Sequence, residues 1–377
     1  MKILIASRWF KPVMNPRSFR ATELVNELLR KGHNIDLFIP EGSEYSSRDK
    51  LKVHTIAIAK HKNANSVIFS SQKVTAKRKF LQLLKDFLVY FLGDSPFQIM
   101  YAWSLYHKIN DSLKTDKYDA IISISYPFYV NVAAACAIKR NQENCGITIA
   151  DCGDPFFYNP AIKRPIYFKW LEKFTLQKFD FISLPIKEAI PAYKSYNVEE
   201  KIRIIPQGFE ITDIDEKEYI KNRVPTFCFA GMFYENIRNP QFFLDFLLSL
   251  KDDFKFIVYI LPNKFSMNLL AKYSLELKEK LEVRTPLERS SLIKEMAKMD
   301  FLINFDNSNS SQKPSKLIDY AITKRPIISF NEHTFNKENF IKFFNGDYTN
   351  QEKIDVSQYD IKNIVQKFEE LITEGKR

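Results

Sequence analysis

Short apolar runs alternate with longer amphipathic segments along the first half of this chain. The segment from Pro16 to Lys31, for example, carries apolar residues at helical spacing. The short runs are apolar throughout, which is typical of strands buried on both faces of a parallel sheet. The pattern predicts an α/β domain whose strands are Lys2–Ser7, Ile35–Ile39, Lys52–Ile58, Tyr118–Ser125, Gly146–Ala150, Asp180–Leu184 and Lys201–Ile205.

The same alternation begins again after a charged segment, Thr212–Arg223. We therefore expect two domains, residues 1–207 and 208–355, followed by a final segment, 356–377. That last segment contains an amphipathic helix, Ser357–Leu371, which needs a surface to cover. The strands expected in the second domain are Thr226–Ala230, Phe254–Ile260, Leu281–Arg284, Phe301–Phe305 and Ile327–Phe330.

Helices are expected between these strands. In the first domain two of them, Ile162–Lys178 and Lys187–Tyr196, follow the last apolar runs. The others expected are Phe97–Leu113, Tyr129–Lys139, Pro240–Leu250, Ser266–Lys278 and Glu288–Met299.

The stretch Ser311–Ser329 predicts an anion-binding site in the second domain. A polar loop follows a strand there and leads into a helix that opens near Ser315. The free N–H groups and the dipole of a helix start favour an anion. Lys313, Ser315 and Lys316 add donors at the same end, whereas Asp319 lies one turn further on, where it can accept hydrogen bonds from a diol.

Polar residues in the first domain also follow strands or open a helix. Arg17 and Arg20 lie at the start of the first helix, and Asp151 and Asp154 follow the strand at Gly146–Ala150. Such carboxylates can act as a base or bind a sugar hydroxyl, and they can equally cap a turn. The two arginines can bind an anion or simply lie on the surface.

Composition narrows the classes of protein. The chain has 377 residues, 45% of them hydrophobic, so it can build large cores. No apolar run reaches about 18 residues, which predicts no membrane-spanning helix. No signal peptide is evident, and the four cysteines show no paired spacing, so we expect a cytoplasmic protein with reduced thiols. Only 9 glycines are present, and no glycine-rich dinucleotide fingerprint occurs.

A net charge of +11 suggests an anionic partner or simply a solvated surface. The basic segment Ser71–Lys79 runs into an aromatic segment, Phe80–Leu92. The pair could lie on an anionic membrane, at the inner face of the cytoplasmic membrane, or form a core helix with a solvated neighbour. No nucleic-acid-binding module is recognisable, so nucleic acid is not expected as a partner.

Six motifs occur along the chain in this order: RKGHNIDLF, SISYPF, ADCGDPF, IRIIPQGFE, FAGMFYENIRNP and PSKLIDYAITKRPIIS. Together they make the chain resemble bacterial glycosyltransferases of the GT-B fold and the family-4 type. The resemblance covers nearly the whole length. It implies two facing Rossmann-like domains with parallel sheets, and a last helix that crosses back to the first domain. It also implies that the second domain mainly holds a nucleotide-sugar and that the first domain holds an acceptor.

The resemblance implies a donor site in the second domain. Asp319 matches the family's ribose-binding carboxylate, while Ser311 stands where the family usually has a sugar-binding Glu. Arg238 is expected on the diphosphate together with Lys316, because two cations can neutralise this leaving group without a metal. The full expected donor set is Gly231, Tyr234, Arg238, Lys313, Ser315, Lys316 and Asp319.

The resemblance also implies the reaction. A sugar would pass from a nucleotide-diphosphate sugar to a hydroxyl of a lipid-linked or polysaccharide acceptor in cell-envelope synthesis, with no cofactor beyond the co-substrate. Asp154 is expected as a base or acceptor-orienting group, with Asp151 as a second candidate, and Arg17, Arg20 and Tyr126 are expected on the acceptor side. Retention and inversion both stay open. Two alternatives also stay open: a nucleotide-sugar epimerase of the same fold, and a non-catalytic nucleotide-sugar-binding subunit.

Overall fold

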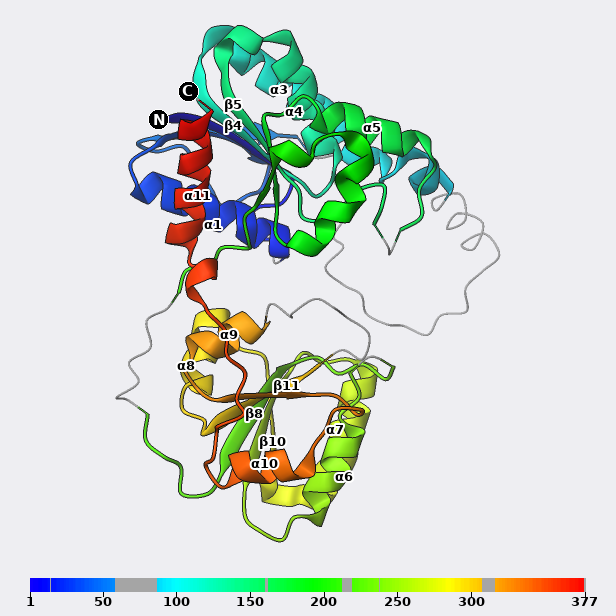
Figure 1. Cartoon of the computed structure of the whole chain (residues 1–377), viewed down its shortest axis with the longest axis vertical. Coiled ribbons are helices and arrows are strands. Elements are labelled where there is room, and N and C mark those ends of the chain that lie inside the picture. The colour runs from blue at the N-terminus through cyan, green and yellow to red at the C-terminus, as the bar shows by residue number, and fades with distance from the viewer. Residues whose placement is uncertain are drawn as a thin grey trace. The chain divides into compact units, whose positions relative to one another are not determined.

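Two α/β units make up the chain (Figure 1). In the computed structural model, residues 1–13, 15–57, 87–159, 162–211, 219–236, 238–306 and 316–375 are described. The first unit comprises Met1–Glu210 and Gln358–Arg377, and the second comprises Ile211–Ser357. The carboxyl-terminal helix is therefore part of the first unit.

The first unit is built on a seven-stranded parallel sheet in the order β3-β2-β1-β4-β5-β6-β7. The order reverses between β1 and β4, and ligands of such sheets bind at the carboxyl ends of the strands near this switch point. The strands are β1 Lys2–Ser7, β2 Asn34–Pro40, β3 Leu51–Ile56, β4 Tyr118–Ile124, β5 Cys145–Asp151, β6 Phe181–Leu184 and β7 Ile202–Ile204.

Helices cover both faces of this sheet. Alternate residues of β1 point to opposite sides, so Ile3 and Ile5 pack with α1 Pro16–Arg30 and α11 Ile361–Glu374. Leu4 packs on the other side, in a core shared with three further helices. These are α3 Pro96–Thr115, α4 Tyr129–Arg140 and α5 Tyr167–Leu176, and short 3-10 helices lie at Gln142–Asn144, Lys187–Tyr196 and Glu199–Lys201.

The last helix covers a surface, as its amphipathic pattern requires. α11 packs beside α1, and its buried residues include Ile364 and Phe368. An isolated bridge between Phe209 and Asp360 leads the chain into this helix.

The second unit has a five-stranded parallel sheet in the order β10-β9-β8-β11-β12. Its switch point lies between β8 and β11. The strands are β8 Thr226–Gly231, β9 Lys255–Ile260, β10 Leu281–Arg284, β11 Phe301–Phe305 and β12 Ile327–Phe330.

Phenylalanine dominates the core of the second unit. Phe227, Phe243, Phe305 and Phe340 are all at most 2% exposed, and their rings meet edge to face. The helices are α6 Gln241–Ser249, α7 Lys264–Leu277, α8 Arg289–Met296, α9 Lys316–Ile322 and α10 Lys337–Phe344, with a 3-10 helix at Lys278–Lys280. A further 3-10 helix, Ser357–Tyr359, spans the boundary to the first unit.

Two expected helices need correction, and one observed helix was not expected. The helix expected over Ile162–Lys178 begins only at Tyr167, after Pro165, which has no N–H for a helix interior. Lys187–Tyr196 is a 3-10 helix that contains Pro191. α10, which begins at the N-cap Asn336, was not predicted from the sequence.

No helix among the described residues is both long enough and apolar enough to cross a bilayer. The basic segment Ser71–Lys79 and the start of the aromatic segment, up to residue 86, lie outside the described residues.

Candidate functional site

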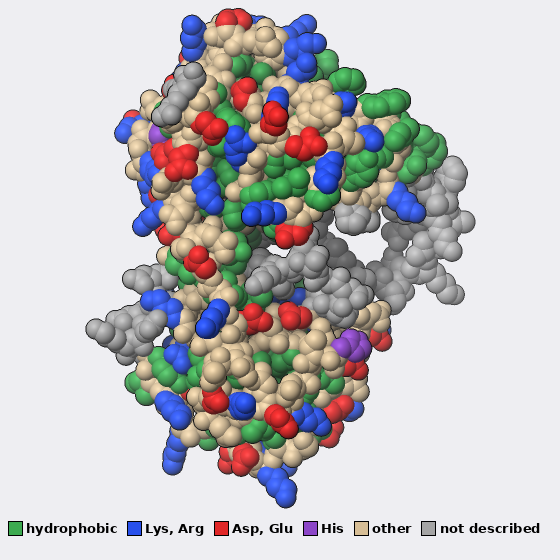
Figure 2. All heavy atoms as spheres, in the orientation of Figure 1, with side chains coloured by type: hydrophobic (Ala, Val, Ile, Leu, Met, Phe, Trp, Pro, Cys, Tyr) green, Lys and Arg blue, Asp and Glu red, His purple; other side chains and the backbone are tan. Residues whose placement is uncertain are grey.

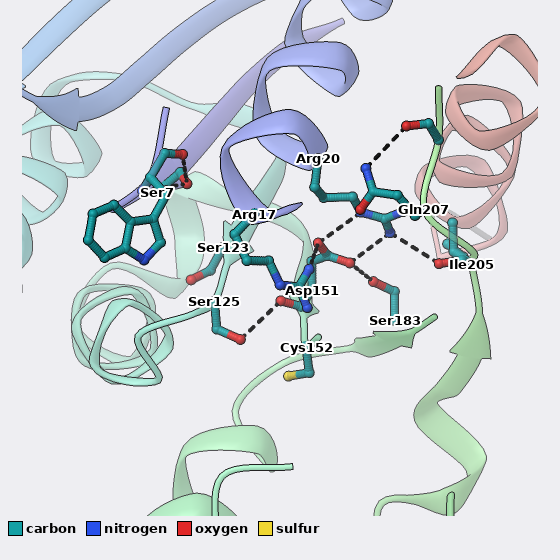
Figure 3. A network of polar contacts seen from close by, with 12 residues as sticks. Ser7, Arg17, Arg20, Ser123, Ser125, Asp151, Cys152, Ser183, Ile205 and Gln207 are labelled. Carbon is teal, nitrogen blue, oxygen red and sulfur yellow. Dashed lines mark hydrogen bonds and ion pairs between the residues drawn. The ribbon is translucent and has the colours of Figure 1, made fainter. Parts of the chain in front are cut away.

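A buried carboxylate organises the carboxyl edge of the first sheet (Figure 3). Asp151 is the last residue of β5 and is 1% exposed. Arg20 donates to both of its oxygens, from Nη2 to Oδ1 at 2.8 Å and from Nε to Oδ2 at 3.1 Å. Ser183 of β6 donates to Oδ1, and Arg17 Nη1 lies 3.4 Å from Oδ2.

Arg20 also ties this network to the chain beyond β7. Its Nη2 donates to the Ile205 carbonyl at 3.2 Å, and its Nη1 donates to the Pro206 carbonyl. Burial alone would raise the pKa of Asp151, but Arg20, Arg17 and the Ser183 hydroxyl outweigh it and lower that pKa. The carboxylate is thus ionised and enclosed. Asp151 and Arg20, expected as a catalytic and an acceptor-side residue, have side chains 2% and 3% exposed and are engaged with each other.

The Arg17 side chain packs against Gly153, in the space that a Cβ atom would fill in any other residue. A Cβ on Gly153 would lie 1.5 Å from Arg17 Nη2. That Nη2 atom is buried and donates to no group of the described residues. Burial lowers the pKa of Arg17, and the nearby Asp151 opposes this shift. Arg17 therefore presents a donor at the carboxyl edge of the sheet.

Asp154 and Tyr126 lie in the loops after β5 and β4. Asp154 is exposed, and it lies close enough to Arg17 to favour the charge of that guanidinium. Tyr126 is 44% exposed, and its hydroxyl bonds the carboxyl group of Asp94. Burial raises the pKa of Tyr126, and the Asp94 charge adds to this rise. Asp154 and Tyr126 thus follow β5 and β4, which are neighbours in the sheet, and Arg17 lies at the same carboxyl edge.

A lysine lies across the end of β8 in the second unit. A Cβ on Gly231 would fall 1.7 Å from Lys316 Nζ, and Gly231 has φ +153°, so glycine suits this position in two ways. Tyr320, one turn further along α9, is fixed to β8 because its hydroxyl accepts from the Ala230 N–H at 2.8 Å. The Lys316 ammonium lies 5.3 Å from the centre of the Phe229 ring. β8 and α9 thus hold Lys316 at the switch point of the second sheet.

Positive charge is concentrated at this position. Burial, together with the nearby Arg238, lowers the pKa of Lys316 to about 8, while Asp319 opposes both. Arg238 is held by backbone hydrogen bonds in both directions with Tyr234, each 3.1 Å long. Burial also lowers the pKa of Arg238. No carboxylate in the described part of the chain lies within ion-pair distance of Lys316, so this site favours an added anion.

A pocket of about 130 Å³ adjoins Arg238. Its walls come from the loop after β8, from the end of β11 at Phe305 and Asp306, and from the residues after β12. Asn239, Asn331 and His333 add polar groups to its lining. The pocket is therefore formed at the carboxyl ends of three strands, where the fold predicts a ligand site.

Asp319 follows Lys316 on α9 and pairs with Arg289. The Nε and Nη2 atoms of Arg289 lie 2.8 and 2.7 Å from Asp319 Oδ1. Burial raises the pKa of Asp319, and Arg289 opposes that rise. Sequence reasoning missed Arg289, because it lies 30 positions before Asp319 and only the packing of α8 on α9 brings the two together.

The structure thus gathers four expected donor-site residues in the second unit, Gly231, Arg238, Lys316 and Asp319, with Tyr234 at the loop that holds Arg238. Lys313 and Ser315, together with Ser311, lie outside the described residues. No group of three His, Cys, Asp or Glu side chains in the described ranges is arranged to hold a metal ion.

No protein-family model and no curated protein sequence matches this chain. Solved structures match nearly all of it. The lipopolysaccharide outer core galactosyltransferase WaaB, in its apo form, is 11% identical with a TM-score of 0.60, over 99% of both chains. A glycosyltransferase from Rickettsia africae ESF-5 is 13% identical with a TM-score of 0.60, over 100% of this chain and 98% of that one. HepE from Anabaena, solved with UDP-glucose, is 10% identical with a TM-score of 0.52, over 99% of this chain and 100% of its own.

These likenesses confirm the resemblance to GT-B glycosyltransferases. They also confirm the expected fold class, with two Rossmann-like units built on parallel sheets. At identities of 10–13% they establish the fold, and the chemistry has to be argued from the residues of this chain.

Proposed function

We propose that this chain is a glycosyltransferase that moves a sugar from a nucleoside-diphosphate sugar to a hydroxyl group of a lipid-linked or polysaccharide acceptor. The observation that carries the proposal is the Lys316 ammonium, half-buried at the end of β8 with its pKa lowered to about 8 and with Arg238 beside it. Two cations in a partly dry site suit a diphosphate, which leaves with negative charge when the glycosidic bond breaks.

The second unit would hold the donor. Lys316 and Arg238 would bind the diphosphate, and Asp319 would accept hydrogen bonds from the ribose hydroxyls, with Arg289 favouring its charged form. Lys313 and Ser315 remain candidates by their place before α9. Metal independence belongs to the same proposal, because these cations supply the charge that a divalent ion would otherwise provide. Uridine is the first nucleotide to test, since the structural neighbour HepE was solved with UDP-glucose.

The first unit would hold the acceptor. Arg17 offers a buried donor, while Asp154 is exposed beside it and is our candidate for the group that orients or deprotonates the acceptor hydroxyl. Asp151 is assigned a positioning role in place of a catalytic one, because Arg20, Arg17 and Ser183 already surround its carboxylate.

The test begins with ligand binding to the full chain. UDP should raise the melting temperature of the native chain, because a ligand that binds only the folded state stabilises it. Lys316→Met should lose about 1.5–3 kcal/mol of binding free energy, the range for a hydrogen bond to a charged group, or roughly 10- to 100-fold in Kd. Lys342→Met is the matched control, since Lys342 is exposed on α10.

Product analysis then separates the activities. Transfer predicts release of UDP from a UDP-sugar that depends on an added acceptor, and a glycosylated product. Conversion of one UDP-sugar into another without acceptor would instead support an epimerase. The chain could also bind UDP but catalyse neither reaction with a panel of sugars and acceptors. That result would contradict the proposed activity but not the proposed donor site.

A further inference from the structure

The Arg8 guanidinium is held at the carboxyl end of β1 without an acidic partner in contact. It lies 4.7 Å from the centre of the Trp9 ring and 4.9 Å from the centre of the Tyr101 ring, and its Nε donates to Gln98 Oε1 at 2.8 Å. Arg8 is 9% exposed, and neither of its Nη atoms meets a hydrogen-bond acceptor among the described residues. Its position is therefore set by Gln98 and two rings, while both Nη groups stay available to a ligand.

A carboxylate with one unpaired oxygen lies near Arg8. Asp94 directly precedes Ser95, the N-cap of α3, and its Oδ1 accepts from the Ser95 N–H at 2.7 Å. Its Oδ2 is buried and has no hydrogen-bond partner in the part of the chain that the structure describes. Burial raises the pKa of Asp94, and the Ser95 N–H and the nearby Tyr126 hydroxyl oppose that rise. A buried acceptor without a donor costs free energy, which a hydroxyl group of a ligand would recover.

Arg164 brings a second guanidinium to the same carboxylate from the segment after β5. Its Nη1 donates to the Phe156 carbonyl at 2.6 Å, and the guanidinium lies 4.2 Å from the centre of the Phe156 ring. Gly93, next to Asp94, packs against this ring, since a Cβ there would fall 3.0 Å from it. The Arg164 Nε atom is buried and donates to no group of the described residues. Phe156 thus holds a second unpaired donor near Asp94.

These groups meet at the switch point of the first sheet. β1 and β4 are neighbours, and Ser7 pairs with Ile124 at their carboxyl ends, so the residues after both strands emerge at the same place. The charges of Arg164 and Arg8 both act on the Asp94 carboxyl group, and the Tyr126 hydroxyl lies beside it. We name the four side chains the Arg8 cluster: Arg8, Asp94, Tyr126 and Arg164.

The charge of the chain as a whole does not select a place for an anion. On the face shown in Figure 2, Lys and Arg side chains are interspersed with Asp and Glu side chains over both units. The excess of positive charge, +11 for the whole chain, is thus spread out on this face and not gathered in one basic field. Recognition of an anion by the first unit therefore has to come from local groups such as the Arg8 cluster.

We infer that the Arg8 cluster binds an anionic saccharide, a sugar unit that carries a phosphate or carboxylate group near a free hydroxyl. Arg8 and Arg164 would bind the anionic group, because the N–H groups of a guanidinium match its oxygens. Asp94 Oδ2 would accept from the hydroxyl. A neutral sugar would leave one positive charge uncompensated, since two guanidinium groups face one carboxylate, and an anion without a hydroxyl would leave Oδ2 without a donor.

This inference deepens the proposed function, on which it rests for the view that the first unit holds the acceptor. It gives the acceptor a chemical class, an acidic saccharide. Because Asp94 already compensates one of the two arginines, the cluster suits a single anionic group, whereas the diphosphate is proposed for Lys316 and Arg238 in the second unit. No residue proposed for the donor belongs to the Arg8 cluster, so the two proposals can fail separately.

Ligand-observed NMR titration of the full chain measures the selectivity. The probes differ at one carbon only: glucose, glucose phosphorylated on its primary hydroxyl, and glucuronate. At least one of the two anions should bind about tenfold or more tightly than glucose, because it adds charge-assisted hydrogen bonds to the arginines. The tighter anion identifies phosphate or carboxylate as the group recognised. Equal binding of all three probes, or no binding of either anion, would overturn the inference.

Replacing Arg8 places the anion in the molecule. Arg8→Met keeps a long side chain between the rings and Gln98, and it should remove the preference for the anion over glucose. Arg48→Met is the matched control, because Arg48 is exposed in the same unit, and it should keep the preference of the native chain. A preference that Arg8→Met retains would place the anion elsewhere and overturn the inference.

Asp94→Asn tests the hydroxyl contact in a chain that keeps both arginines. Inorganic phosphate should bind this variant more tightly than it binds the native chain, because a negative charge beside it is gone. The phosphorylated glucose should gain less, since its hydroxyl loses a charged acceptor, so its affinity relative to inorganic phosphate should fall about tenfold. An equal gain for both probes would show that Asp94 does not bind the sugar and would overturn the inference.

A UDP titration of the native chain, run beside these measurements, separates the two proposals. UDP binding without selectivity for the anionic sugars would contradict the Arg8 cluster and leave the donor site supported. Selectivity for an anionic sugar without UDP binding would support the cluster as a saccharide site and contradict the proposed donor site.

Discussion

The two sheets place cations at equivalent edges in different electrostatic settings. In the first unit Arg17 and Arg20 share the carboxylate of Asp151, and in the second unit Lys316 lies beside Arg238 with no carboxylate of the described residues in ion-pair distance. Each edge has a glycine against which a cation packs, Gly153 in one case and Gly231 in the other.

The difference indicates which edge is built to receive negative charge. A buried arginine that already meets a carboxylate contributes structure, because its charge is compensated within the fold. A half-buried lysine beside a second cation is held in an unfavourable state that an anion relieves, and both causes lower the pKa of Lys316. The comparison therefore supports the proposed placement of the diphosphate in the second unit, and it leaves Arg17 Nη2 as a buried donor at the edge of the first sheet.

The largest expected effect is on the stability of the first unit. Asp151→Asn should cost about 3–5 kcal/mol of unfolding free energy, because removing one partner of a buried ion pair leaves Arg20 uncompensated. Urea denaturation, followed by a signal from the tryptophans, all of which belong to the first unit, measures this loss. Asp154→Asn, three positions on and exposed, should leave stability within about 0.5 kcal/mol.

The same carboxylate gives a pH signature. The pKa of Asp151 is lowered in the folded state, so its contribution is complete above its ordinary value near pH 4 and is lost as pH falls through the folded value. The Asn variant should lack this part of the acid sensitivity. Equal stability of Asp151→Asn and the native chain would contradict the structural role and reopen Asp151 as a catalytic candidate.

An intermediate effect, on UDP affinity, is expected when a methyl group is added at the carboxyl edge of the second unit's sheet. Gly231→Ala places a Cβ 1.7 Å from Lys316 Nζ, so the ammonium must move from the end of β8. Affinity for UDP should fall roughly tenfold or more, because a hydrogen bond to a charged group contributes about 1.5–3 kcal/mol. Isothermal titration calorimetry measures this change.

Gly153→Ala is the matched change in the first unit. There the new Cβ would meet Arg17 instead, 1.5 Å from its Nη2, and UDP affinity should stay that of the native chain. A loss of UDP affinity in both variants, or in neither, would break the distinction between a donor edge and an acceptor edge.

The fold could largely be predicted from the sequence, because each buried strand is a short apolar run and the runs occur in the order of two parallel sheets. β1, β10, β11 and β12 have the expected bounds. α10 escaped prediction, since its core residues Phe340, Phe343 and Phe344 follow a polar loop whose cap, Asn336, gives only a weak local signal. The helix expected over Ile162–Lys178 is shorter than its apolar periodicity predicts, because it begins only after Pro165. The helix expected over Lys187–Tyr196 contains Pro191 and is a tighter 3-10 helix.

The site was less predictable, because its groups meet through packing. Lys316 and Arg238 could be proposed from their loops, but the close approach of Lys316 to Gly231 depends on the hydrogen bond between Tyr320 and Ala230. The pair of Asp151 with Arg20 spans 131 positions. None of these distances leaves a local pattern in the sequence.

The smallest expected effect is a pH dependence of donor affinity that belongs to Lys316. In the free chain its pKa is lowered to about 8, whereas a bound diphosphate would raise it, because an opposite charge favours the protonated form. Affinity for UDP-glucose should therefore be constant below about pH 8 and fall above it, by about tenfold between pH 7 and 9. Calorimetry across this range measures the fall, and Lys316→Met, which cannot titrate, should bind more weakly but equally at both pH values. A native chain whose affinity does not change between pH 7 and 9 would show that Lys316 does not meet the diphosphate, and the contrast between the two edges would then rest on Arg238 alone.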